Sequence, residues 1–254
     1  MDSIKEKLPQ LLLENMQLMK EFRANSYKEA FLNLLESYKP LFQHMEEVYR
    51  TTEDKKSFIN EIAEDFVSKV KIHHDASLGK LNKKTAILDY NMVMSSFVIP
   101  CILEFRGEIS EVLADALLDA WNQTFTNYKL RKGNFADIDG SFKRKLCFIT
   151  TAVCENLGKP DDCYELSTLR TFRDSYMMQH ISGKELVKEY YEIAPELVMR
   201  IDQYKMADAI YQDIYRQYLQ PCITHIEQNE YDKCEKLYIE MVCTLKNRYA
   251  GVTS

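Results

Sequence analysis

The stretch Thr85–Ile99 reads TAILDYNMVMSSFVI and carries apolar residues on nearly every side of a helix. A helix that is apolar all round belongs in the interior of a protein. The uncharged run Tyr90–Leu103 spans 14 residues and includes Asn91 and Pro100. That is short of the roughly 18 to 20 apolar residues that cross a bilayer. We therefore expect a buried helix at the centre of the core and no membrane span.

Amphipathic helices are indicated on both sides of this stretch. Apolar residues recur there in steps of three and four, which is the period of a helix with one buried face. The stripes run over residues 4–22, 31–38, 58–70, 113–128, 198–218 and 231–245. Only 7 Gly and 6 Pro in 254 residues leave little material for the tight turns of a β-fold. The sequence predicts an all-α fold, a bundle of about eight to ten helices in one compact body.

The apolar period fails between Arg131 and Ser141, where glycine, asparagine and aspartate gather. Such a cluster is typical of a loop. We expect this loop to separate an N-terminal helical region, residues 1–132, from a C-terminal region, residues 141–254, with both packed as one body.

Two prolines are expected to shape the helices. Pro40 should kink or end the helix in which it lies, because proline lacks the backbone N–H. Pro195 suits the first position of a helix, which would put Ala194 at the cap. Alanine cannot cap, so the substitution Ala194→Ser is expected to raise stability by about 1 kcal/mol.

Three spaced motifs occupy the segment 147–195: Cys147–Ala152, Glu165–Asp174 and Tyr190–Pro195. In this order they resemble the CFI-box, a small helical module of many bacterial proteins. The resemblance implies a bacterial origin and a compact helical hairpin, and it implies no reaction. The helical spacing predicts that five apolar residues of this segment are buried together: Phe148, Ile149, Leu166, Leu169 and Phe172.

The chain departs from the CFI-box pattern at three places. Family members commonly carry Ala, a Tyr-Gly pair and Ser where this chain has Thr150, Cys154-Glu155 and Ala194. Any chemistry of Cys154 is therefore peculiar to this chain and its near relatives.

The cysteines of the segment stand at positions that favour polar or reactive roles. Cys147, Thr151 and Cys154 follow one another at i, i+4 and i+7 and so share one face of the first helix. A capping-box pattern is expected to place Cys163 in the first turn of the second helix. Free N–H groups there stabilise a thiolate, so Cys163 has the strongest argument for reactivity.

Charged residues follow Cys163 along the second helix. Arg170 and Asp174 lie four residues apart, with Arg173 between them. These side chains would suit an anion or thiolate site, or they would tie the hairpin together through ion pairs, and we favour the ion pairs. Tyr190 and Tyr191 cannot face the same way, so one should lie in the core with its hydroxyl hydrogen-bonded.

Cys222 and His225 lie one helical turn apart, a spacing that chelates zinc when two more ligands converge. Cys147, Cys154 or Cys163 would have to supply these ligands. A two-residue spacing alone is a weak signal. We predict no metal and no cofactor, with zinc as the lesser alternative.

The rest of the sequence narrows the class of protein. It contains no phosphate-binding loop, nucleophile elbow or His-Glu-x-x-His motif, which disfavours an enzyme. A formal charge of −6 disfavours nucleic acid as a partner. Seven cysteines without an export signal predict reduced thiols in the cytoplasm.

Two functions remain. The preferred one is a non-enzymatic helical scaffold or interaction module that binds another protein or itself. The alternative is a thiol-based redox or metal-binding protein that uses Cys163 with Cys147 or with Cys222 and His225.

Overall fold

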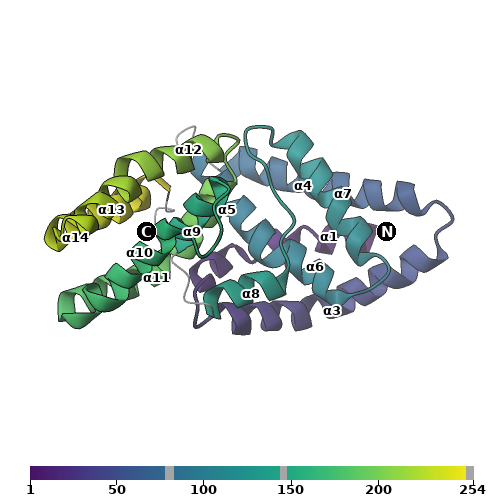
Figure 1. The fold of residues 1–254 in the computed structure, drawn as a ribbon. Coiled ribbons are helices and arrows are strands. Elements are labelled where there is room, and N and C mark those ends of the chain that lie inside the picture. The colour runs from purple at the N-terminus through teal and green to yellow at the C-terminus, as the bar shows by residue number, and fades with distance from the viewer. Residues whose placement is uncertain (78–82, 144–147, 250–254) are drawn as a thin grey trace. The chain divides into compact units, whose positions relative to one another are not determined.

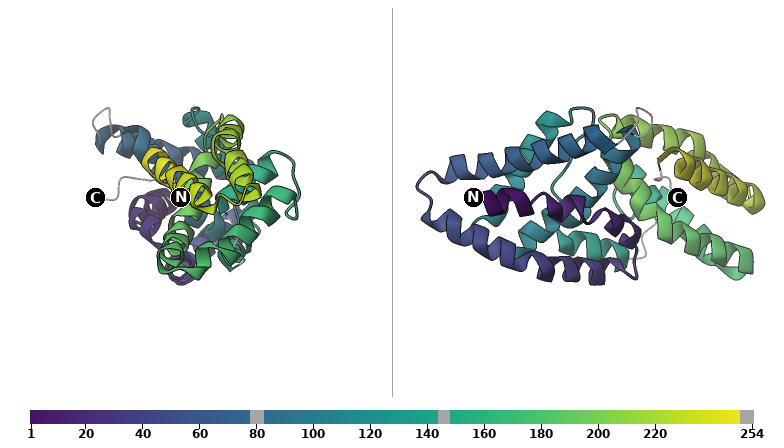
Figure 2. Two further views of the ribbon diagram at one scale, coloured as in Figure 1. Left: turned by 60° about the vertical axis from the view of Figure 1, so that its left-hand side comes forward. Right: turned by 180° about the vertical axis from the view of Figure 1, so that it is seen from behind.

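The computed structural model describes residues 1–77, 83–143 and 148–249, and these residues form helices and no strand (Figure 1). The prediction of an all-α fold is confirmed. Figure 2 follows the same helices from two further directions. If helical segments that continue directly into one another are taken together and the two separate 3-10 segments are left out, the described residues hold 12 helices, close to the number expected. Contacts divide the chain into two compact units, Met1–Ser141 and Phe142–Ser254.

Unit 1 is built around the stretch on which the sequence analysis began. Its elements are α1 (Asp2–Lys7), α2 (Gln10–Leu13), η1 (Met16–Glu21), α3 (Tyr27–Thr51), α4 (Lys55–Ser77), α5 (Lys83–Val93), η2 (Met94–Val98), α6 (Ile99–Phe105), α7 (Ser110–Thr124) and α8 (Phe135–Lys143), the last of which crosses the boundary. Helices α4 and α7 pack on each other, and α6 packs on both α3 and α7.

The helical path Ala86–Phe105 forms the centre of this core, as expected. Within the described residues it is the one helix long and apolar enough to cross a membrane by length and composition, and 83% of that window is buried inside the structure. A helix buried in the core of a protein can have the same length and apolar composition as a membrane-spanning helix.

Tyr27 supports this path where Pro100 interrupts it. Proline has no N–H, so the carbonyl four residues earlier, that of Ser96, loses its helical donor. The helix widens into a π-turn over Met94–Val98, and the Tyr27 hydroxyl donates to the Ser96 carbonyl at 2.9 Å. Burial raises the pKa of Tyr27, which keeps the hydroxyl protonated as a donor.

Two features of unit 1 differ from what the sequence indicated. Pro40 does not end its helix, since α3 continues from Tyr27 to Thr51 with Pro40 inside it. Buried residues on both sides of the proline, such as Phe31 and Phe42, hold one face against the core. Part of the expected loop 131–141 is the helix α8. The Asn134 side chain accepts the Asp137 N–H at 2.9 Å and caps this helix, and Phe135 stacks on Phe31 with ring centroids 4.3 Å apart.

Unit 2 contains the CFI-box-like segment. Its elements are α9 (Phe148–Asn156), α10 (Tyr164–Ser175), η3 (Met177–Gln179), α11 (Ile181–Asp202), α12 (Ala207–Ile214), η4 (Tyr215–Leu219), α13 (Gln220–Glu227) and α14 (Tyr231–Tyr249). Of the five apolar residues expected in its core, Ile149, Leu166, Leu169 and Phe172 are buried. Phe148 is half-buried and packs against the same core.

Helix α11 does not begin at Pro195, so this expectation is also wrong. The helix is continuous from Ile181 to Asp202 with Pro195 inside it. Its apolar face runs from Val187 to Ile201 and stays buried across the proline, which holds the helix together despite the lost hydrogen bond. Ala194 is therefore an interior residue with 0% exposure and not a cap.

Candidate functional site

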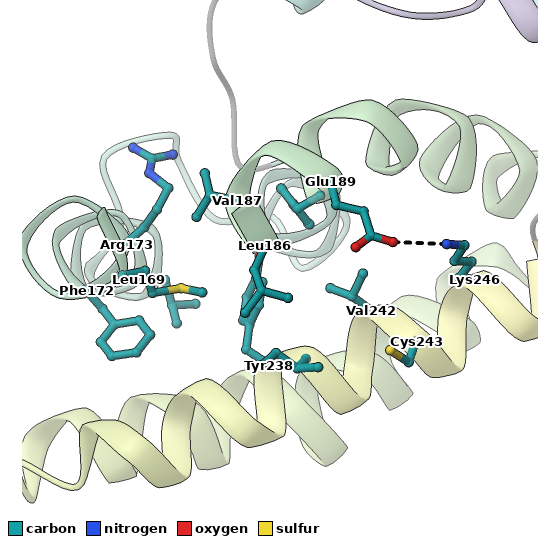
Figure 3. Close-up of a pocket in the computed structure, with 13 residues that line it drawn as sticks. Leu169, Phe172, Arg173, Leu186, Val187, Glu189, Tyr238, Val242, Cys243 and Lys246 are labelled. Carbon is teal, nitrogen blue, oxygen red and sulfur yellow. Dashed lines mark hydrogen bonds and ion pairs between the residues drawn. The ribbon is translucent and has the colours of Figure 1, made fainter. Parts of the chain in front are cut away.

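An apolar groove opens on unit 2 between α10, α11 and α14 (Figure 3). Its free volume is about 90 Å³, which is room for a side chain rather than a cofactor, since small-molecule pockets usually hold several hundred Å³. Ten of the lining residues are apolar or aromatic side chains or a cysteine: Leu169, Phe172, Met177, Leu186, Val187, Tyr190, Tyr238, Ile239, Val242 and Cys243. The other lining residues are the charged Arg173, Glu189 and Lys246.

The charged residues border the groove on two sides. Figure 3 shows Arg173 on α10 on one side and an ion pair between Glu189 and Lys246 on the other. This pair joins α11 to α14 at 3.0 Å, and both side chains are about half exposed. Arg173 binds the carboxylate of Asp174 at 2.7 Å and donates to the Tyr191 hydroxyl at 2.7 Å.

Tyr190, which lines the groove, connects helix α11 to helix α9. Its hydroxyl accepts the backbone N–H of Ile149 at 3.0 Å. Tyr190 is buried and Tyr191 is half-buried, as expected for the pair. Tyr190 therefore acts as a structural cap for α9; a hydrogen-bonded core tyrosine was expected, but its partner Ile149 was not.

Arg170 is held by the loop before its own helix. Its guanidinium donates to the Asp161 carbonyl at 2.9 Å and to the Asp161 carboxylate at 2.7 Å. Arg170, Arg173 and Asp174 thus all take part in ion pairs, but the pairs of Arg170 with Asp161 and of Arg173 with Asp174 each lie within one segment and do not tie two helices together. The hydrogen bond from Arg173 to Tyr191 does join α10 to α11. Thr151 is buried, and Cys147 lies outside the described residues.

Cys163 stands beside Cys154, which was not the thiol expected. Cys163 is the N-cap residue of α10 and so lies one position before the first helical turn, where it was predicted. Cys154 is fully buried, and the two thiols interact electrostatically. Burial and the neighbouring thiol raise the pKa of Cys154 to about 12.

Three polar residues near Cys154 and Cys163, namely Lys159, Glu165 and Tyr215, are connected to one another. Lys159 and Glu165 form an ion pair, and the Tyr215 hydroxyl donates to the Glu165 carboxylate at 3.3 Å. The ion pair raises the pKa of Lys159 and lowers that of Glu165. No motif pointed to Lys159, and Tyr215 could not be linked to Glu165 from a local pattern because it comes from η4, 50 positions further along the chain.

Cys222 and His225 take different partners from each other. The Cys222 thiol donates to the carbonyl of Cys234 at 3.7 Å, and His225 pairs with Glu230 at 2.8 Å. No group of three or more His, Cys, Asp or Glu side chains that could hold a metal occurs in the described part of the chain.

Comparison of the chain with known protein families, with curated proteins and with solved structures finds no match in any of the three.

Proposed function

We propose that unit 2 is a protein-interaction module that takes an apolar side chain of a partner protein into the groove between α10, α11 and α14. The observation that carries the proposal is an open apolar groove bordered by two cations, Arg173 and Lys246. The resemblance of residues 147–195 to the CFI-box is part of the proposal, as the module that presents the groove.

The size and shape of the groove favour an anchoring side chain. Interfaces derive most of their binding energy from a few side chains that enter well-packed pockets. A free volume of about 90 Å³ suits one such anchor. Helical walls on both sides favour an amphipathic helix as the segment that carries it.

The charges at the border indicate which residues should flank the anchor. Arg173 and Lys246 place two positive charges at the border, where Arg173 pairs with Asp174 and Lys246 with Glu189. The exposed pair of Glu189 with Lys246 contributes little by itself, so a partner carboxylate can compete for Lys246. The occupant we propose is an amphipathic helix with an apolar anchor flanked by acidic residues.

The test begins with a photoreactive amino acid in place of Ile239, which lines the groove. The matched control carries the same amino acid in place of the exposed Glu240 on the other face of α14. A peptide is then made from the segment captured at position 239, and its affinity for the purified full chain is measured by calorimetry.

Val242→Glu puts a charge in the groove, and Asn247→Glu puts the same charge on an exposed position of the same helix. We expect the peptide to bind the wild type and Asn247→Glu alike and Val242→Glu at least about tenfold more weakly. Lys246→Glu, at a half-exposed position, should also weaken binding and guards against a folding defect in Val242→Glu. Equal affinity for all four proteins, or capture of a second copy of this chain at position 239, would overturn the proposal.

A further inference from the structure

Cys154 and Cys163 lie at the two ends of a tight loop in unit 2. The loop is closed by two backbone hydrogen bonds, from Lys159 N–H to the Cys154 carbonyl at 2.9 Å and from Cys163 N–H to the Pro160 carbonyl at 3.0 Å. Gly158 takes a left-handed φ of +69° in this turn, which glycine adopts without strain. These contacts bring Cys154 and Cys163 close together, and the two thiols interact electrostatically.

We propose that Cys163 is an oxidation site for peroxides and that Cys154 converts the oxidised sulfur into a Cys154–Cys163 disulfide. The two thiols differ in the way that this sequence of steps requires. Cys163 is half-buried and accessible to a small oxidant, whereas Cys154 has 0% exposure and is not accessible. A redox-sensitive cysteine is commonly an accessible thiol next to a second, resolving thiol.

The first step consumes one molecule of hydrogen peroxide. Cys163 reacts as the thiolate, after its proton has passed to water. The sulfur attacks one peroxide oxygen, an S–O bond forms and the O–O bond breaks. The hydroxide that leaves takes up a proton from water and departs as water, so that the proton lost by Cys163 is accounted for, and Cys163 is left as a sulfenic acid.

The second step forms the disulfide. The Cys154 sulfur attacks the Cys163 sulfur, the S–S bond forms and the S–O bond breaks. The leaving hydroxide takes the Cys154 proton and departs as a second water. Two thiols have then lost two electrons and two protons, and the peroxide has been reduced to two waters.

A second thiol pair in the same unit provides an internal control. The Cys222 thiol donates to the backbone carbonyl of Cys234 at 3.7 Å, and both residues have 0% exposure. Both pairs therefore bring two cysteines together, and of these four residues Cys163 alone is accessible to the oxidant. Cys243 is exposed and serves as the reference for an accessible cysteine.

The experiment treats the full chain with hydrogen peroxide in small excess, blocks the remaining thiols and maps the peptides by mass spectrometry without reduction. We expect a peptide pair bridged through Cys154 and Cys163, and free thiols at Cys222 and Cys234. In Cys154→Ala the sulfenic acid should persist on Cys163 and react with dimedone. Cys163→Ser should give neither product.

The variant Cys154→Ala removes a buried side chain, so its folding is checked by circular dichroism, and the bridged peptide of the wild type stands as a result without it. The proposal requires Cys163 to be oxidised at least about tenfold faster than Cys243, since exposure alone would make the two equal. Equal rates, a bridge from Cys163 to Cys147, or a bridge between Cys222 and Cys234 in place of the expected one would overturn it.

Discussion

The Tyr190 hydroxyl in α11 accepts the backbone N–H of Ile149 in the first turn of α9, at 3.0 Å and across 41 positions of sequence. The first four N–H groups of a helix have no partner within that helix. A side chain from another helix therefore does here what a serine or aspartate does at an ordinary cap. This one contact ties the start of the CFI-box-like segment to its end.

The first prediction removes that acceptor. Tyr190→Phe keeps the ring but leaves the buried Ile149 N–H without its partner, which costs about 1–3 kcal/mol. The matched control is Tyr164→Phe, which removes a hydroxyl from a ring that is 58% exposed and should change stability by about 0.5 kcal/mol or less. Urea unfolding of both variants measures the difference. Equal midpoints would mean that the Tyr190 contact contributes nothing.

Unit 1 contains a similar contact, made by a carboxylate. The two oxygens of buried Glu46 accept the N–H groups of Glu108 and Ile109, both at 3.0 Å, just before α7 begins. Arg50 also binds Glu46 at 3.0 Å. The carboxylate thus joins α3 to the start of α7 through two charge-assisted hydrogen bonds.

The second prediction exchanges this carboxylate for an amide. Glu46→Gln turns one acceptor into a donor that faces a backbone N–H, and we expect a loss of about 1–3 kcal/mol. Glu47→Gln makes the same change at the neighbouring exposed position and should stay within about 0.5 kcal/mol. Thermal melts of the two variants decide, and a Glu46 variant as stable as the Glu47 variant contradicts the assigned role.

These caps show which part of the fold could be predicted. The period of apolar residues is local, so the central helix, predicted over Thr85–Ile99, and four of the five residues predicted to be buried in the segment 147–195 followed from the sequence alone. Glu46 and Tyr190 act on backbone groups 62 and 41 positions away in sequence. No local pattern contains such a partner, because only the packing of helices determines it.

The prolines and thiols were mispredicted for the same reason. Local rules end a helix at Pro40 or Pro195, but a continuous buried face outweighs one lost hydrogen bond in each helix. The residues expected near Cys163 were inferred from the spacing of residues within each helix, without knowledge of how the helices pack. The loop of residues 155–162 instead turns Cys163 back onto Cys154, which a pattern of separate helices does not show.

The third prediction concerns the stability of the protein against pH. The pKa of Cys154 is raised to about 12 in the folded protein from an ordinary value near 9. The folded state therefore keeps a proton that the unfolded state releases, so the contribution is complete below about pH 9 and is lost as the pH rises towards 12. The loss is at most about 1.4 kcal/mol per pH unit.

Urea unfolding of the wild type and of Cys154→Ala at several values between pH 8 and pH 10.5 isolates this contribution, because the other titrating groups are common to both proteins. We expect the wild type to lose stability more steeply than the variant above pH 9. Parallel curves would show that Cys154 ionises in the folded state as it does in the unfolded one.

The last prediction concerns Ala194, for which the structure reverses the sign expected from sequence. A serine there would cap a helix only if the helix began at Pro195, but Ala194 lies inside α11 with 0% exposure. A buried hydroxyl without a partner costs about 1–3 kcal/mol. Donation to a carbonyl of the preceding turn offsets about 0.5–1.5 kcal/mol of this.

We therefore expect Ala194→Ser to lower the free energy of unfolding by about 1 kcal/mol, where a cap would have raised it. Ala209→Ser makes the same change at an exposed position of helix α12. It carries only the lower helix propensity of serine, about 0.5 kcal/mol at most. The difference between the two variants in urea unfolding measures the effect of burial. An Ala194 variant that matches or exceeds the wild type would mean that the packing around this residue has room for a hydroxyl, contrary to its complete burial.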